Sequence, residues 1–189
     1  MTRAWDGLGT AEEKIRHLVE RVELNGEVDE ILEGCMQDHC TLATSFSRVF
    51  SFLGTQLGVP AVFVHTIGEN LSMEVFSLGV DAGILEKVGR DMLTATEMKT
   101  FVRTGLRWHV MPLDMAGEQI GTFGMALPSS DGRPEALVFD LMDAVTEELD
   151  QFFFAIQENR RKQLAIEAIQ LALKNPILVQ AVDEAVAVL

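Results

Sequence analysis

The sequence is short of cations, of cysteines and of long apolar runs. Its 189 residues contain 15 Lys and Arg against 29 Asp and Glu, which gives a formal charge of −14. Nucleic-acid binding needs clustered cations that neutralise phosphates, so this balance argues against a nucleic acid as partner. An anionic membrane surface would repel the chain for the same reason. We therefore expect a soluble protein whose copies repel one another weakly at long range.

The chain also lacks targeting and membrane segments. No stretch approaches the ~20 apolar residues that span a bilayer, and the N-terminal MTRAWDGLGTAEEK has no apolar core of signal-peptide length. Cys35 and Cys40 are the only cysteines. Two thiols five residues apart without a secretory signal are typical of a reducing compartment, so we expect free thiols and a cytoplasmic location.

Motifs of phosphate binding and of nucleophilic catalysis are missing. Neither G-x-G-x-x-G nor G-x-x-x-x-G-K-[ST] occurs in the sequence. Ser45, Ser47 and Ser51 follow a helical pattern outside any nucleophile elbow. Paired carboxylates such as Glu12-Glu13 and Glu147-Glu148 fall on the polar faces of expected helices. We therefore expect no enzymatic activity.

The sharpest local cluster of reactive side chains is Cys35 to Cys40 (CMQDHC). On a helix, Cys35 and His39 share a face, which is the geometry of half a zinc site. A closed site needs about four ligands, and the sequence has no second Cys/His pair, so the pattern is weak evidence for metal. Five helical residues turn through about 140°, which points the two thiols apart. A non-helical break between Asp38 and Thr41 would make a disulfide possible.

Apolar periodicity and turn residues predict the secondary structure. The N-terminal region carries helical spacing, with a capping box at Thr10 and Glu13 and a stop at Asn25-Gly26. The expected helices are 10–26, about 28–35, 41–58, a short one at 94–105, and 133 to about 174. The expected strands are 59–67 and 71–78, which form one antiparallel hairpin, and 106–115 and 118–127, which form another around Ala116-Gly117.

This order predicts an α+β fold, in which an antiparallel sheet packs helices on one face. Gly121 and Gly124 lie inside the last strand, where glycine usually marks the close approach of another backbone or helix. We expect a domain over 1–154, with N-terminal helices at 10–58, the sheet region at 59–127 and a closing helix at 133–154. Residues 155–189 form a helical extension, which we expect to lead to an output domain.

The closing helix carries an apolar seam whose steps alternate between three and four residues, as in a coiled coil. A helix of about forty residues would be roughly 60 Å long, so we expect part of it to extend beyond the domain. The first turns are expected to cover the sheet, and the rest to pair with a second copy or with the segment after Pro176. The residues predicted to form this dimer helix are Val138, Leu141, Val145, Leu149, Phe152 and Ile156. The pattern stops abruptly at Val188-Leu189, which suggests a longer natural chain.

Three stretches resemble the GAF domain family, a small-ligand sensing and dimerising module. Leu42 to Ile67 is similar to the family's helix that passes through Gly-Val-Pro into its first strand. Pro112-Leu113, Gly117 and the IGTFG run from Ile120 to Gly124 resemble its characteristic hairpin. Phe139 to Phe153 resembles its closing helix. The resemblance implies a central antiparallel sheet with a helical bundle on one face and a ligand cavity on the other.

The resemblance also implies dimerisation through the terminal helices, but it names no cofactor. The Asn-Lys-Phe-Asp-Glu signature of the cyclic-nucleotide-binding members is absent. No cysteine follows the first strands, as bilin attachment or methionine-sulfoxide reduction in this family would require. Apolar and polar side chains on the expected strands give the candidate ligand pocket. These residues are Phe63, His65, Met73, Val75, Trp108 and Met111.

Three hypotheses follow from the sequence. The first is a cytoplasmic sensory or regulatory module that dimerises and binds a small ligand. The second is a ligand-free dimerisation domain whose cavity is filled by its own Phe and Met side chains. The third is a small metal or redox protein that uses Cys35, His39 and Cys40.

Overall fold

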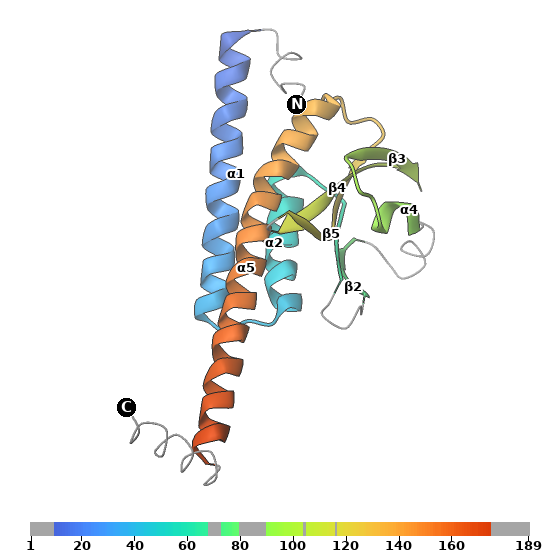
Figure 1. Cartoon of the computed structure of the whole chain (residues 1–189). Coiled ribbons are helices and arrows are strands. Elements are labelled where there is room, and N and C mark those ends of the chain that lie inside the picture. The colour runs from blue at the N-terminus through green and yellow to red at the C-terminus, as the bar shows by residue number, and fades with distance from the viewer. Residues whose placement is uncertain (1–9, 68–72, 80–89, 104, 116, 175–189) are drawn as a thin grey trace. The chain divides into compact units, whose positions relative to one another are not determined.

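The fold was analysed in a computed structural model, which describes residues 10–67, 73–79, 90–103, 105–115 and 117–174 (Figure 1). The chain divides into two compact units, 1–150 and 151–189. The expected loop from Gly79 to Arg90 lies mostly outside the described residues. So do the turn at 68–70 and the segment after Pro176.

The N-terminal region forms one helix, α1 (Ala11–Gln37), and not the two helices expected around Asn25-Gly26. Its first turn is capped as the sequence predicts, because the Thr10 hydroxyl accepts from the Glu13 backbone and Glu13 accepts from the Thr10 N–H. Glycine inside a helix costs only about 1 kcal/mol relative to alanine. The Asn25 side chain donates to a neighbouring helix, so tertiary contacts compensate the weak local propensity.

The second helix, α2 (Leu42–Leu57), agrees with the prediction at both ends. Thr41 caps it by accepting a hydrogen bond from the Thr44 backbone N–H. Gly58 ends it in the left-handed conformation at φ 65°, which glycine adopts without steric cost. Its buried residues, Phe46, Val49, Phe50 and Leu53 among them, form the amphipathic face that packs on the sheet.

Five antiparallel strands form one sheet in the order β2-β1-β5-β4-β3. The two predicted hairpins are confirmed. The strands are β1 (Ala61–Ile67), β2 (Met73–Leu78), β3 (Lys99–Arg103), β4 (Leu106–Met115) and β5 (Glu118–Pro128). β5 lies at the centre between β1 and β4, and it is buried from Gly121 to Leu127.

The short helix expected at 94–105 is wrong. The chain forms a four-residue helix, α4 (Arg90–Leu93), and then the edge strand β3. Thr100, Phe101 and Val102 are β-branched or aromatic, and they pair with His109, Trp108 and Arg107 on β4. Backbone pairing with β4 therefore prevailed over the local capping signal of Thr94 and Glu97.

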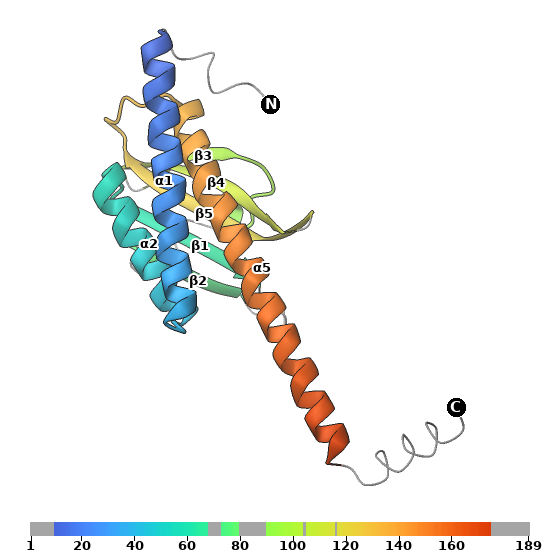
Figure 2. The same cartoon turned by 90° about the vertical axis from the view of Figure 1, so that its left-hand side faces the viewer.

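The last described helix, α5, runs from Glu135 to Leu173 and follows Pro134 as the sequence predicts. Within the first unit, α1, α2 and the start of α5 cover one face of the sheet, and α4 lies on the opposite face (Figures 1 and 2). The α+β fold with a helical layer on one face is thus confirmed.

The second unit is described from Gln151 to Lys174. Its helical segment presents many apolar side chains to solvent, and these are Phe154, Leu164, Ile166, Ile169, Leu171 and Leu173. None of the described helices combines the length and the apolar character that crossing a bilayer requires.

Candidate ligand site on the α4 face of the sheet

The strand register divides the sheet residues between two faces. Side chains alternate along each strand, so Phe63 and His65 of β1 share one face with Trp108 and Val110 of β4. On this face Phe63, Trp108 and Val110 form a buried cluster with Met92 of α4 and Ala95 just after it. The face that α4 covers is therefore the one where the sequence places most of the candidate pocket.

An aromatic pair lies at the centre of this face. The ring centroids of Phe63 and Trp108 are 5.8 Å apart, with the planes inclined at 45°. Gly124 is the cross-strand partner of Phe63, and a Cβ added there would lie 2.1 Å from the Phe63 ring. The Phe63 ring thus occupies the space that a side chain at Gly124 would fill. The predicted close approach of another backbone is found at Gly121, where an added Cβ would lie 2.0 Å from the His65 carbonyl oxygen, whereas the neighbour of Gly124 is a side chain.

His65 and Trp108 are buried, and no well-aligned hydrogen bond reaches the Trp108 Nε1 or either ring nitrogen of His65 within the described residues, although the Leu93 carbonyl lies close enough to His65 to affect its pKa. His65 is 1% exposed and Trp108 is fully buried. Burial lowers the pKa of His65, and the backbone carbonyl of Leu93 opposes this shift only in part. The imidazole is therefore neutral at pH 7. Buried polar groups normally find a partner, so these two make the α4 face a candidate site, although Arg107 Nε, His109 Nε2 and Asp150 Oδ1 also lack one elsewhere among the described residues.

Two side chains of β5 hold the chain that crosses this face. The Thr122 hydroxyl donates to the carbonyl of Leu93 at 2.9 Å. The Gln119 amide donates to the carbonyl of Ala95 at 2.7 Å. Both acceptors lie at the end of α4 or just after it, so the covering segment is anchored directly to the central strand.

Of the six predicted pocket residues, Phe63, His65, Val75 and Trp108 share one face of the sheet, whereas Met111 does not. Val75 is paired with His65 in the β1–β2 register and is 37% exposed. The side chain of Met73 lies outside the described part of the chain. Met111 is on the opposite face, where the hydroxyl of Thr146 in α5 lies 3.9 Å from its sulfur. Since strand side chains alternate, Met111 cannot line the same site as Trp108.

The predicted dimer helix is largely an internal surface. Val138, Leu141, Val145 and Leu149 are between 0 and 2% exposed, because this face of α5 covers the sheet of its own chain. Phe152 is 4% exposed, and Ile156 is partly exposed. The first four residues therefore leave no free surface for a second copy. The alternation of three- and four-residue steps marks core packing here, and not a seam between chains.

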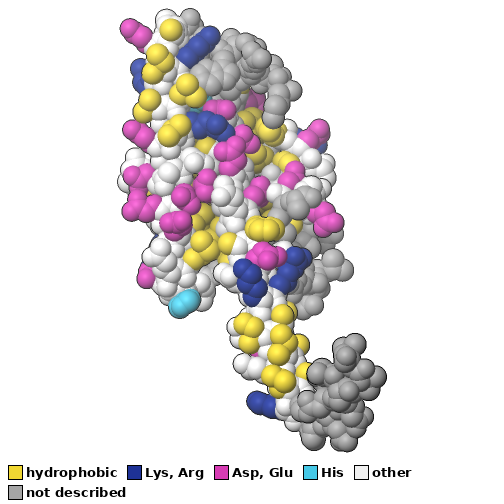
Figure 3. All heavy atoms as spheres, turned by 60° about the vertical axis from the view of Figure 1, so that its left-hand side comes forward, with side chains coloured by type: hydrophobic (Ala, Val, Ile, Leu, Met, Phe, Trp, Pro, Cys, Tyr) yellow, Lys and Arg dark blue, Asp and Glu magenta, His cyan; other side chains and the backbone are white. Residues whose placement is uncertain are grey.

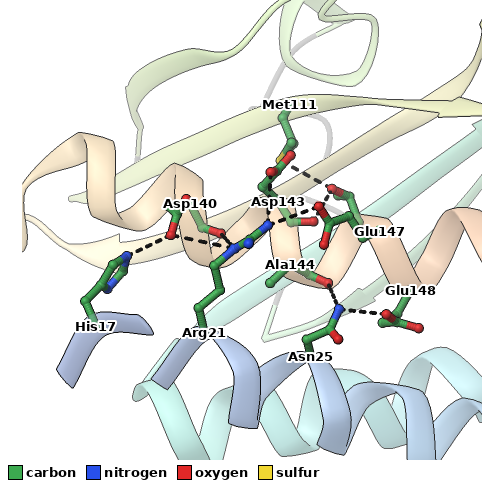
Figure 4. A network of polar contacts seen from close by, with 10 residues as sticks. His17, Arg21, Asn25, Met111, Asp140, Asp143, Ala144, Glu147 and Glu148 are labelled. Carbon is green, nitrogen blue, oxygen red and sulfur yellow. Dashed lines mark hydrogen bonds and ion pairs between the residues drawn. The ribbon is translucent and has the colours of Figure 1, made fainter. Parts of the chain in front are cut away.

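A polar interface between α1 and α5 was missed by sequence reasoning (Figure 4). His17 contacts the Asp140 carboxylate at 2.8 Å. Arg21 contacts Asp143 at 3.4 Å and Glu147 at 3.0 Å. The available signal was the four-residue spacing of His17, Arg21 and Asn25 on α1, which places three polar groups on one helix face.

Asn25 completes this interface one turn further along α1. Its side-chain amide donates to the carbonyl of Ala144 at 3.2 Å and to the Glu148 carboxylate at 2.6 Å. The predicted helix stop is therefore an interhelical contact. Glu148 is 8% exposed, so its expected position on a solvated face is wrong.

Carboxylates outnumber cations on this side of α5, and the pKa values of two of them are raised. Burial and the neighbouring Glu147 raise the pKa of Asp143, while Arg21 lowers it. Burial, followed by the charges of Asp114 and Asp143, raises the pKa of Asp150 to about 7. A proton on Asp150 is therefore favoured below neutral pH.

The Cys35–His39 pair does not share a helix face, because α1 ends at Gln37. His39 adopts φ 54° in the turn that follows and is exposed, whereas Cys35 is buried. No group of three or more His, Cys, Asp or Glu side chains suited to a metal ion occurs among the described residues. The geometry assumed for the half-site is thus wrong.

Comparison with known proteins shows the fold. No family model matches the sequence, and no curated protein matches it. The GAF domain of A. aeolicus NLH2 in an inactive state is 16% identical, with a TM-score of 0.56, and the match covers 74% of this chain and 98% of that one. The GAF domain of a protein assigned as a sensor histidine kinase from Pseudomonas syringae pv. tomato is 15% identical, with a TM-score of 0.57 over 83% and 99%. The chain therefore has a GAF-like fold.

Proposed function

We propose that this chain is a sensory or regulatory GAF-like module that binds a small molecule on the α4 face of its sheet. One observation carries the proposal, namely the buried Trp108 N–H, which lacks a partner, on the same face as the buried His65 ring, which makes no well-aligned hydrogen bond within the described residues. A ligand that accepts from the Trp108 indole N–H and bonds to the neutral His65 ring would satisfy both. The solved GAF domains that share the fold fit a sensory role.

The chemistry of this face favours an uncharged or weakly polar ligand. Neither Lys nor Arg belongs to its buried cluster, in which Trp108 packs with Phe63, Val110 and Met92. Apolar pockets with a few polar groups are typical of small-molecule sites. A multiply charged ligand would lose hydration without gaining a counter-ion.

Isothermal titration of the whole chain against cyclic nucleotides, amino acids and other metabolites tests this proposal. A binder should lose affinity in Trp108→Phe, which keeps an aromatic side chain, although a smaller one, and removes the donor. The exposed substitution Val102→Ala on β3 serves as the matched control. A ligand that binds Trp108→Phe as tightly as the wild type would contradict the assigned site.

We also propose that two copies pair through α1. Ile15, Leu18, Val19 and Val22 are 40 to 67% exposed and recur at three- and four-residue spacing, which gives an apolar stripe on this helix (Figure 3). These exposed residues are distinct from His17, Arg21 and Asn25, through which α1 contacts α5. Sedimentation equilibrium should show a dimer that Val19→Glu with Val22→Glu dissociates, while Val102→Glu has no effect.

A ligand-free scaffold is the second candidate. It is favoured by the contacts of Phe63 and Trp108 with Met92 and Ala95, since these side chains occupy part of the α4 face themselves. Titrations without heat across the panel, together with a retained dimer, would favour this alternative. Under either function we expect a cytoplasmic protein without catalytic activity, with no nucleic-acid or membrane partner, that passes its state to an output domain.

A further inference from the structure

The turn after α1 brings the two cysteines together. Asp38 caps the helix, His39 takes the left-handed conformation, and the chain reverses direction. The Cys40 backbone N–H donates to the Cys35 carbonyl at 2.8 Å, and the His39 N–H donates to the Met36 carbonyl at 3.2 Å. These are the two hydrogen bonds of a Schellman motif. The two thiols would be about 140° apart on a continuous helix, but α1 ends between them, so this angle does not apply.

This geometry suits a disulfide. A direct backbone hydrogen bond brings the two residues close together, as a disulfide with its Cα separation of roughly 4.4–6.8 Å requires. The two side chains are also in hydrogen-bonding contact. The pKa of the Cys40 thiol is raised mainly by burial and, to a smaller extent, by this contact. Cys35 is buried and Cys40 is half-buried, so reagents from solvent reach Cys40 first.

A cation from α2 lies beside the thiols. The Arg48 guanidinium is 3.7 Å from the Cys35 sulfur and 3.5 Å from the Asp38 carboxylate. Its charge lowers the pKa of Cys40 against the larger effect of burial, while Asp38 raises it. A thiolate formed at either cysteine would be stabilised by Arg48.

We propose that Cys35 and Cys40 form a redox-active dithiol, which low-molecular-weight disulfides convert into an intramolecular disulfide. In the first step the Cys40 thiolate attacks a sulfur of the disulfide, the S–S bond breaks, and one thiol leaves as a mixed disulfide forms. In the second step the Cys35 thiolate attacks the Cys40 sulfur and releases the second thiol. The two cysteines are oxidised, the external disulfide is reduced to two thiols, and the cysteine protons end on those thiols.

The test uses the full chain in buffers of oxidised and reduced glutathione at a series of ratios. Acid quenching and alkylation of free thiols are followed by intact-mass measurement. The expected product is a monomeric chain lighter by two hydrogen atoms, with no alkylated cysteine. A stable glutathione adduct in which Cys35 stays free would overturn the proposal, as would disulfide-linked dimers or two thiols that remain free in pure oxidised glutathione.

Single substitutions distinguish the roles of the two thiols. Cys35→Ser should stop at the mixed disulfide on Cys40, because no second thiol is available. Cys40→Ser should react at least tenfold more slowly than Cys35→Ser, because the remaining thiol is buried. Equal rates for the two variants would contradict the assigned order of attack. Circular dichroism establishes that each variant is folded.

The contribution of Arg48 is tested separately. Arg48→Met should slow formation of the mixed disulfide several-fold at constant pH, because the thiolate loses its nearby positive charge. Arg16→Met removes the same charge from an exposed position on α1 far from the thiols, and it should leave the rate unchanged. Equal slowing in both variants would show a general charge effect and would remove Arg48 from the proposal.

Discussion

The α1–α5 interface and the α4 face of the sheet treat their polar groups in opposite ways. Between the helices, His17, Arg21 and Asn25 each contact a carboxylate or a carbonyl. Beneath α4, His65 and Trp108 make no well-aligned hydrogen bond within the described residues. Satisfied polar groups fix one arrangement of two helices, whereas unsatisfied ones cost stability. This difference between the two regions favours the α4 face for the proposed ligand, although His109 Nε2 and Asp150 Oδ1 on the helical side also lack a partner among the described residues.

The largest expected effect comes from the apolar core of the helical side. Leu149→Ala should lower the free energy of unfolding by about 2–5 kcal/mol, because a fully buried side chain is replaced by a cavity. Urea denaturation measures the loss, and Leu164→Ala, at a position 56% exposed, should change it by less than about 0.5 kcal/mol. Similar losses at both positions would contradict the assignment of Leu149 to the core.

A smaller loss is expected from the polar contacts of the same interface. Arg21→Met leaves Asp140, Asp143 and Glu147 without their shared cation, which should cost about 1–3 kcal/mol at pH 7 after allowance for partial exposure. The deficit should shrink in acid as the carboxylates take up protons. Arg161→Met, from an exposed pair, is the control. A deficit independent of pH would mean that lost packing, and not charge, is responsible.

Asp150 is the exception on the helical side, because its Oδ1 is buried without a hydrogen-bond partner among the described residues. Its pKa is raised to about 7, so between about pH 4 and pH 7 the folded chain holds a proton that the unfolded chain releases. Wild-type stability should therefore fall as pH rises through this window, relative to Asp150→Asn. Thermal unfolding of both proteins from pH 4 to pH 8 measures the difference. Parallel curves would show that Asp150 titrates normally.

The smallest effect on stability is expected on the α4 face. Trp108→Phe should change the free energy of unfolding by less than about 1 kcal/mol, because removal of an unpartnered donor offsets the cavity left by the smaller ring. Urea denaturation of the ligand-free chain measures it. A loss as large as that of Leu149→Ala would place the indole N–H in a hydrogen bond and would remove the contrast between the two sides.

The sequence predicts most of the fold and little of the site. Period-two runs with turn residues identify both hairpins, and Gly58 and Pro134 mark helix ends correctly. The edge strand β3 was missed because its pairing with β4 is a tertiary contact that local capping residues do not reveal. Apolar periodicity in α5 is the same for a core face and for a dimer seam, so only burial distinguishes them.

The candidate site depends on which face of the sheet each strand residue points to. A sequence specifies this only when the strand register is known. Trp108 and Met111 differ by an odd number of strand positions, and they consequently lie on opposite faces. The partners of His17, Arg21 and Asn25 are more than a hundred residues away in the chain. No local pattern connects such residues before the fold is known.

The strand order also has a consequence for biosynthesis. A ribosome completes β1 and β2 long before β5, yet β5 is the strand that occupies the centre of the sheet next to β1. Until residues 118–128 emerge, the hairpin of β1 and β2 carries an open backbone edge rich in Val and Phe. Such an edge can recruit strands from other nascent chains. Translation speed between Leu78 and Glu118 therefore sets how long the growing chain is exposed to misassembly.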